Sequence, residues 1–213
     1  MRLEIDATLA VGLAKSLEPA RSKDSTRLAL TGVKWEMPYG ETPVNVFTTT
    51  DGYRLHRVTI GDVVAVDAGL SGIAQSVTLS GDVIKAVLSM AKLAGKTGRV
   101  VLSSSDTGAD VAAYTGNVGT VEMLGGVRVD SLSVEFANCV DIIARSSGTE
   151  LPAYFSPKYL GDVIDAAGVW AGKDGQVRVD SLHVAKPARI VSWNGAGTFT
   201  GIIMPQRAPK AGA

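Results

Sequence analysis

The histidines and the cysteine are the side chains best suited to metal or redox chemistry, and the chain holds few of them. His56 and His183 are its two histidines, and Cys139 is its one cysteine. Two histidines make a poor metal site, and a single thiol permits neither an intrachain disulfide nor a cysteine-based zinc site. We therefore expect no metal and no cofactor, and we place both histidines in strands or at the surface. A reducing compartment fits this cysteine usage.

One short motif could carry hydrolytic chemistry. The segment Asp106-Thr107-Gly108-Ala109 matches the active-site loop of retroviral-type aspartic proteases, where paired aspartates share a proton and activate water. Those proteins place apolar residues before the aspartate, whereas Ser103-Ser104-Ser105 precede it here, and Val118-Gly119 and Leu124-Gly125 fit the later bracing segment poorly. Asp, Thr and Gly also favour a hairpin turn. We expect the turn and no catalytic residue, and we keep the protease as an alternative.

Composition excludes several broad classes. The chain has 213 residues, 46% of them hydrophobic, and 21 basic residues balance 21 acidic ones. This is a globular mix that can bury a good core, but it gives no whole-surface attraction to nucleic acid. Any DNA contact must come from charge gathered on one face. The start of the chain does not read as a signal peptide, and no apolar run approaches the ~18 residues of a membrane span.

The hydrophobic pattern repeats one order of elements about three times. A strand at residues 1–7, a helix at 8–19 and strands at 27–37, 44–50 and 53–60 form the first copy. The second has a strand at 75–79, a helix at 82–95 that Ser80 could cap, and strands at 99–103, 109–115 and 120–129. After a loop-like stretch at 136–149, a helix begins at Ser156-Pro157, and strands at 176–184, 188–193 and 198–203 follow. The copies share this βαβββ pattern without visible sequence identity.

Five segments, in order along nearly the whole chain, resemble the bacterial-type DNA polymerase sliding clamp family. Thr26–Gly32, Thr50–Leu55, Phe136–Asn138, Tyr154–Leu160 and Ile203–Arg207 are similar to the family's Arg-x-x-Leu-x-Gly, Thr-Asp-Gly-His-Arg-Leu, Phe-Pro-Asp-Tyr, Phe-Asn-Pro-x-Tyr-Leu and Val-Met-Pro-Met-Arg. Ala137 replaces the usual proline and Tyr53 the usual histidine. The chain is too short to hold the first half of the family's last domain between the linker and Pro157. The resemblance is therefore to a short form of the clamp, such as a phage-encoded one.

The resemblance implies an α+β DNA clamp fold with repeated βαβββ units, antiparallel sheets outside and helices lining a central hole. Residues 1–130 would be a clamp domain of two units, 131–150 a linker, 151–207 a C-terminal half-domain or second domain, and 208–213 a disordered tail. The family builds rings from twelve units, so three units a chain suggest a homo-tetramer. A degenerate fourth unit within 120–155 would give a trimer.

In this family the hairpin around Asp51-Gly52 and the final strand form a hydrophobic pocket for polymerase peptides. A methionine and branched aliphatic side chains make an adaptable apolar slot, and Gly52 permits close backbone approach. By resemblance the pocket comprises Leu30, Thr50, Gly52, Tyr53, Arg54, Leu55, Ile142, Ile202, Met204, Pro205 and Arg207. Tyr53, which replaces the usual histidine, changes the rim of this pocket and hence the peptide sequence that the pocket would prefer.

Basic residues on and after the first two helices are the candidates for facing DNA. Lysines on flexible stems neutralise phosphates without reading bases, which allows a ring to slide. The set is Lys15, Arg21, Lys23, Lys85, Lys92 and Lys96. On the third helix Asp162 and Asp165 lie beside Lys158, so this helix offers less to phosphate.

The expected function is that of a DNA polymerase processivity factor, similar to the DNA polymerase III beta subunit, which encircles duplex DNA and is not an enzyme. Its partners would be double-stranded DNA of any sequence, the polymerase and other clamp-binding peptides, and a clamp loader. The loader would use the ATP, because the chain has no P-loop and Asn194–Gly197 reads as a turn. The setting would be the cytoplasm, or the host cytoplasm for a phage protein. A non-ring peptide-binding module is the second alternative.

Overall fold

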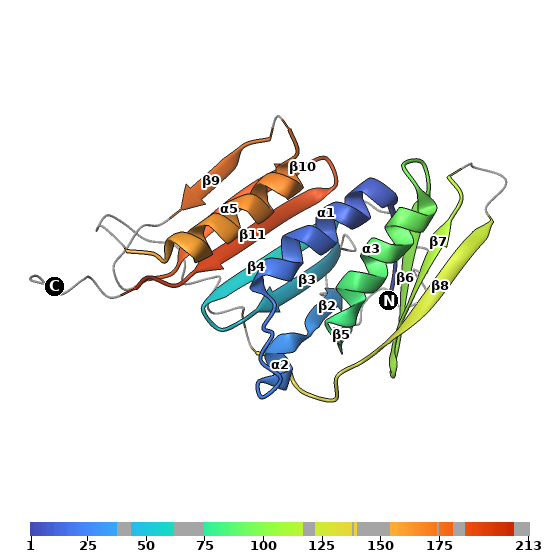
Figure 1. Cartoon of the computed structure of the whole chain (residues 1–213), viewed down its shortest axis with the longest axis horizontal. Helices are drawn as coiled ribbons and strands as arrows, with labels where there is room; N and C mark the ends of the chain where they lie inside the picture. Colours follow the sequence, from blue (N-terminus) through green and yellow to red (C-terminus); the bar gives the residue numbers. More distant parts are fainter. Residues whose placement is uncertain are drawn as a thin grey trace, which may run out of the picture.

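The computed structural model describes residues 1–37, 44–61, 75–116, 122–137, 139, 154–173, 175–180 and 186–206. Antiparallel sheets with helices on one face make it an α+β protein (Figure 1). The elements in chain order are β1 (Arg2–Asp6), α1 (Ala7–Leu17), η1 (Glu18–Ala20), α2 (Leu28–Thr31), β2 (Val33–Met37), β3 (Val44–Thr50), β4 (Arg54–Gly61), β5 (Gln75–Leu79), α3 (Asp82–Ala94), β6 (Arg99–Ser105), β7 (Gly108–Tyr114), β8 (Met123–Asp130), α5 (Pro157–Ala171), β9 (Val177–Asp180), β10 (Ala188–Asn194) and β11 (Gly197–Ile203).

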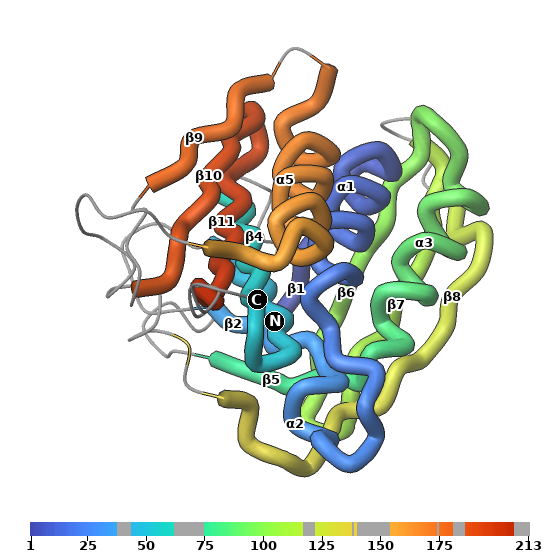
Figure 2. The backbone as a smooth tube through the Cα atoms, turned by 60° about the vertical axis from the view of Figure 1, so that its left-hand side comes forward, coloured from blue at the N-terminus to red at the C-terminus, as the bar shows by residue number. Residues whose placement is uncertain are grey.

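The described strands form two antiparallel sheets. One has the order β1-β6-β7-β8, and the other has the order β5-β2-β3-β4-β11-β10-β9. β1 and β5 are thus exchanged, because each precedes the helix of its own unit but pairs within the sheet of the other. β4 pairs with β11 from Arg54↔Ile203 to Ile60↔Gly197, so the last strand continues the sheet of the first unit (Figure 2).

The long helices α5, α1 and α3 lie side by side over one face of the sheets (Figures 1 and 2). Each buries one stripe of small and aliphatic residues, such as Ala10, Leu13 and Leu17 of α1. Asp6 caps α1 by accepting a hydrogen bond from the Leu9 N–H at 2.7 Å. The described helices are all too short or too polar to cross a membrane.

A continuous apolar core fills the space between the helices and the sheets. At its centre the rings of Trp35 on β2 and Phe47 on β3 stack with centroids 5.4 Å apart. The Trp35 indole N–H donates to Asn45 Oδ1 at 2.8 Å, so its polar atom is satisfied inside the core. This core holds the helices against the strands that carry the candidate site.

Residues 27–37, expected as one strand, divide into the short helix α2 and β2. A local hydrogen-bonded turn explains the difference. Asp24 Oδ1 accepts from the backbone N–H and the hydroxyl of Thr26, and the Leu30 N–H bonds the Arg27 carbonyl. These bonds compete with sheet pairing, so strand pairing begins only after Gly32. The expected tail at 208–213 and most of the loop at 136–149 lie outside the described residues.

Candidate functional site

The hairpin between β3 and β4 has a tightly bonded turn. Asp51 Oδ1 accepts from the backbone N–H groups of Tyr53 and Arg54, both at 3.0 Å. Gly52 has φ +89°, and a Cβ there would lie 2.6 Å from the Arg27 guanidinium. Arg27 itself donates to the Asp51 carbonyl at 3.0 Å. Glycine at position 52 therefore permits both the left-handed turn and the approach of Arg27.

This hairpin meets the end of the last strand. Leu55 lies directly opposite Ile202, and the Met204 N–H donates to the Tyr53 carbonyl at 3.0 Å. Leu55 and Ile202 form a small buried cluster with Phe136 and Cys139. Their neighbours along the strands, His56 and Ile203, belong to the other side of the sheet, where the helices lie. Leu55 and Ile202 are therefore on the face away from the helices.

Arg54 ties the hairpin to the start of α5. Its Nε bonds Asp51 Oδ2 at 3.0 Å, its Nη1 contacts Asp162, and its guanidinium lies 4.8 Å from the centroid of the Tyr159 ring. Lys158 also bonds Asp162, at 2.9 Å. Partial burial works against the charge of Asp162, but the hydrogen bonds from Lys158 and Arg54 outweigh it and lower the pKa of this carboxyl. The Arg54 charge is thus engaged within the chain.

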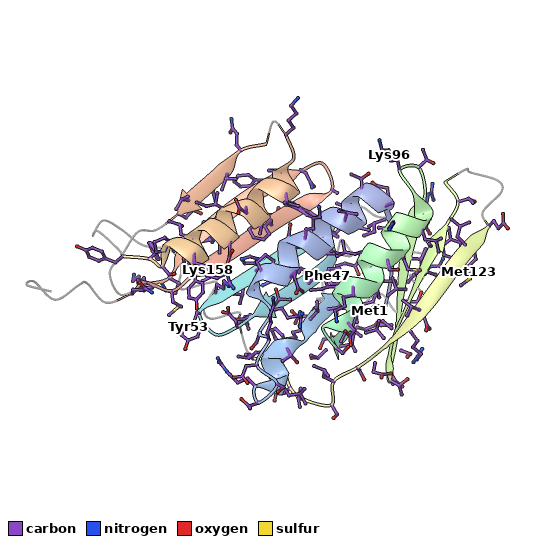
Figure 3. The ribbon with its side chains drawn as sticks, viewed as in Figure 1. Met1, Phe47, Tyr53, Lys96, Met123 and Lys158 are labelled. Atoms are coloured by element: carbon purple, nitrogen blue, oxygen red, sulfur yellow. The ribbon has the colours of Figure 1, made fainter. Side chains whose placement is uncertain are left out.

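Large side chains remain exposed around this junction. Tyr53 is 57% exposed and Met204 is 42% exposed. Tyr53 stacks on Tyr159 of α5 with centroids 6.1 Å apart, and Tyr154, also exposed, accepts the Gln206 N–H on its carbonyl at 2.6 Å. Figure 3 shows Tyr53 at the tip of the hairpin beside Lys158. We call Tyr53, Tyr154, Tyr159 and Met204 the hairpin surface.

Most of the residues expected in the pocket gather here. Thr50, Gly52, Tyr53, Arg54 and Leu55 come from the hairpin, and Ile202, Met204 and Pro205 come from the end of β11 and the residues after it. Leu30 lies in α2, which is held to the hairpin by Arg27. Ile142 and Arg207 lie outside the described residues. The sequence reading missed Tyr159 and Asp162, because nothing local to the third helix marks their contacts with Arg54.

The expected DNA-facing lysines lie on or beside the helix layer. Lys15, Lys85 and Lys92 are exposed on α1 and α3, and Lys96 is exposed just after α3 (Figure 3). Lys85 forms an exposed ion pair with Asp82 at 3.0 Å, which leaves its charge open to competition from phosphate. Exposed Lys23 follows η1.

Arg21 is held more firmly than the lysines. It forms two hydrogen bonds with Glu18, both at 3.0 Å, and lies against Gly81 at the start of α3. Its charge is compensated within the chain, so among the six candidates it is the one least suited to contact a phosphate.

The Asp106 motif forms a hairpin turn, as expected. Asp106 and Thr107 are exposed, and they join β6 to β7 with Ser105 opposite Gly108. The Thr107 hydroxyl accepts from the Arg128 guanidinium at 2.7 Å. The motif therefore forms a hairpin turn that is braced against β8.

His56 is in a strand as expected, but it is fully buried. Its Nδ1 lies 2.6 Å from the Ser16 carbonyl and must carry the proton, because a carbonyl only accepts. Its Nε2 has no partner among the described residues, and the ring lies edge-on to Phe199. Burial lowers the pKa of His56 to about 4, against the opposing effect of the Ser16 hydrogen bond. His183 lies outside the described residues.

Solved structures of bacterial sliding clamps share this fold. The sliding clamp of Caulobacter crescentus has a TM-score of 0.72 at 15% identity, matching 97% of this chain and 65% of its own. The Bacillus subtilis clamp has 0.68 at 17% identity, with 98% and 65% covered. The DNA polymerase III beta subunit of Thermotoga maritima has 0.68 at 14% identity, with 98% and 66% covered.

This chain therefore has the DNA clamp fold and spans about two thirds of the length of those clamps. No family model matches it, and no curated protein matches its sequence.

Proposed function

We propose that this chain is a DNA polymerase processivity factor, a sliding clamp that encircles duplex DNA and tethers a polymerase. The observation that carries the proposal is the junction of the hairpin with the final strand, within a fold shared with bacterial clamps over nearly the whole chain. A clamp needs no catalytic group, because its task is retention by topology. The ring, the DNA path and the peptide contact are all part of the proposal.

In this proposal the helix layer faces the DNA. Lys15, Lys92 and Lys96 would contact phosphates, and Lys85 would exchange its exposed partner Asp82 for a phosphate. Because these are long side chains without a base-reading geometry, binding would be independent of sequence. A separate clamp loader would open the ring, and the ring would be a homo-oligomer joined at strand edges.

The hairpin surface would hold the polymerase peptide. Exposed Met204 and the stacked tyrosines offer apolar area at low entropic cost, and Leu55 and Ile202 are buried in the same hairpin and final strand, on the face of the sheet away from the helices. Arg54 would position the surface, since its guanidinium already bonds Asp51 and Asp162. Residues 1–130 would form one clamp domain, with 131–150 as linker and 151–207 as the unit that completes the peptide site.

The test is polymerase stimulation by a Met204→Asp variant. Met204 is exposed, so a charge there should spare the fold while removing apolar contact with a peptide, and stimulation should fall at least tenfold. Substituting Leu55 would be less informative because it is buried. Met123→Asp is the matched control, a methionine of 57% exposure at the opposite end of the molecule (Figure 3).

Native mass measured on both variants separates loss of partner binding from loss of assembly. Full stimulation by Met204→Asp would remove the peptide assignment. Stimulation without retention on DNA would favour a non-ring interaction module.

A further inference from the structure

After β8 the chain leaves the smaller sheet and runs onto the larger one. The Leu132 N–H donates to the Thr78 carbonyl of β5 at 2.7 Å. The Leu132 side chain also lies against Gly32, just before β2, where an added Cβ would be only 2.8 Å from it. The segment is thus fixed at the β5 edge of the larger sheet. We call residues 132–137 together with Cys139 the strap.

The far end of the strap reaches the middle of the same sheet. Phe136 is 4% exposed and Cys139 is 8% exposed, and they form one buried cluster with Leu55 of β4 and Ile202 of β11. Strands β2 and β3 lie between β5 and β4. The strap therefore crosses both of them on the face away from the helices, and its two buried side chains cover Leu55 and Ile202.

The covered position adjoins the hairpin surface. After Ile202, the next residue Ile203 belongs to the core under the helices, and the Met204 N–H then bonds the Tyr53 carbonyl at 3.0 Å. Alternation along this strand returns the Met204 side chain to the face of Ile202. Phe136 therefore fills an apolar position next to the exposed methionine and tyrosine that would hold a polymerase peptide.

Burial, rather than hydrogen bonding, holds the far end of the strap. Among the described residues, Ser133–Ala137 make no backbone hydrogen bond to a strand of the sheet. The Cys139 thiol donates to the Ala137 carbonyl at 3.2 Å, but this bond lies within the strap itself. The cluster around Phe136 is also separate from the main core, on the other face of the sheet. This end of the strap can therefore lift without unpairing a strand or opening the core.

We propose that the strap is an intramolecular competitor for the peptide site, in which Phe136 occupies the apolar position that a large apolar side chain of a polymerase peptide would take. Binding of such a peptide would lift Phe136 and Cys139 from Leu55 and Ile202. The proposal rests on the proposed function, because it concerns the peptide site of the clamp. It adds what that site holds when no partner is bound.

The attachment of the strap sets the strength of the competition. Because the strap is fixed at Leu132, Phe136 competes at an effective concentration on the order of millimolar, whatever the amount of polymerase. The apparent affinity of a partner falls by the fraction of time that the site is filled. A partner peptide that brings a bulky apolar side chain can displace Phe136, whereas a peptide of small or polar residues gains too little. The strap would thus select bulky apolar peptides.

A competitor and a permanent wall of the site differ in the sign of one effect. If Phe136 only supported Leu55 and Ile202, its removal would weaken peptide binding. If Phe136 competes for the site, its removal strengthens peptide binding. Affinity measured on Phe136→Ala therefore separates the two roles.

Cys139 reports the position of the strap, because it is the one cysteine of the chain. Burial raises the pKa of its thiol to about 11, so the docked thiol reacts slowly at neutral pH. Alkylation by iodoacetamide should be at least tenfold faster in Phe136→Ala than in the wild type. The exposed neighbour gives the matched control, and Glu135→Ala should react at the wild-type rate. Equal rates in Phe136→Ala and the wild type would overturn the proposal.

The competition is tested with a fluorescent peptide of the strap's own sequence, Leu-Ser-Val-Glu-Phe-Ala at residues 132–137. Phe136→Ala should bind this peptide at least fivefold more tightly than the wild type, whose tethered copy fills the site. The same peptide with Phe136→Ala should not bind. On the wild type, which needs no substitution, an excess of the strap peptide should speed alkylation of Cys139 at least threefold. An unchanged or slower rate there would count against displacement and overturn the proposal.

Polymerase stimulation connects the strap with the peptide site. At a limiting concentration of chain, Phe136→Ala should stimulate at least threefold more than the wild type, and an excess of the strap peptide should inhibit both. Native mass checks that the variant assembles as the wild type does. Stimulation equal to or below that of the wild type would overturn the proposal and leave the proposed function standing. No stimulation by either chain would remove the proposed function, and the competition with it.

Discussion

The edge strands β8 and β9 share Val-Arg-Val-Asp but have different surroundings. Val129 of β8 is 4% exposed in the core, whereas Val179, at the same place in the tetrapeptide, is 48% exposed. Arg128 reaches across to Asp110 on β7, while Arg178 bonds Asp180 on its own strand and lies beside Trp193. One edge is partly closed by the end of β5 and the other has no described neighbour.

The difference shows that a strand's role is set by its neighbours rather than by its own residues. Both tetrapeptides place valines toward the helices and charges on the other face, as alternation requires. Their pairing partners nevertheless direct opposite sets of backbone groups to the open edge. Of the two edges, only β9 combines an exposed valine with outward valine backbone groups that have no partner strand among the described residues.

The largest expected contrast between the two sheets is their response to acid, because the sheet that ends at β9 contains buried His56. Burial holds the pKa of His56 at about 4 in the folded chain, against about 6.5 when unfolded. Between these two pKa values the His56 ring is protonated in the unfolded chain and neutral in the folded chain. The free energy of unfolding therefore falls as pH falls. The loss should total about 3 kcal/mol between pH 6.5 and pH 4 and level off below that.

Urea unfolding across this pH range measures the effect. His56→Leu should flatten the slope, although it lowers stability at pH 7, while His183→Gln should keep the slope. An unchanged slope in His56→Leu would show that other groups cause the acid sensitivity.

A direct comparison of the two central valines should give the next largest effect. Val129→Ala removes buried methyl groups from the core and should cost about 2 kcal/mol. Val179→Ala removes exposed methyl groups and should change the free energy of unfolding by less than about 0.5 kcal/mol. Urea unfolding of both variants at low protein concentration makes the comparison. Equal losses would mean that Val179 is covered within its own chain.

Replacing Arg128 or Arg178 should have the smallest effect on the free energy of unfolding. Arg128→Ala breaks an exposed pair with Asp110 and should cost under about 1 kcal/mol. Arg178→Ala removes an exposed bond to Asp180 and the contact with Trp193, and it should cost no more than Arg128→Ala. Urea unfolding of both variants measures the two losses. A loss well above about 1 kcal/mol in either variant would mean that its arginine supports the fold beyond an exposed ion pair.

Local sequence patterns predicted most of the helices and strands. The hairpin around Asp51-Gly52, the strand at 75–79 and the helix at 82–95 were predicted within a residue or two, because turn chemistry and hydrophobic period agree there. Residues 27–31 were predicted as strand and form α2, since the Asp24 turn outweighs the apolar pattern. Exchange of β1 and β5 between sheets could not be predicted from local pattern, because pairing partners are distant in sequence.

Some parts of the candidate site were predicted from the sequence, and others were not. The meeting of the hairpin with β11 followed from the resemblance, and the structure brings those segments together. The contact of Arg54 with Asp162, 108 residues away, leaves no mark in either segment alone. The burial of His56 was also missed, because polar residues in alternating strands read as exposed until the helix that covers them is known.

The central proposal, that this chain holds DNA by surrounding it, is tested most directly by retention on a closed circle of duplex DNA. The protein is placed on nicked circular DNA with the loader and ATP of its own replication system and is then separated from free protein by gel filtration. We predict that it stays with the circle and is released when a restriction enzyme linearises the DNA. Equal retention on circular and linear DNA, or none on either, would contradict the claim.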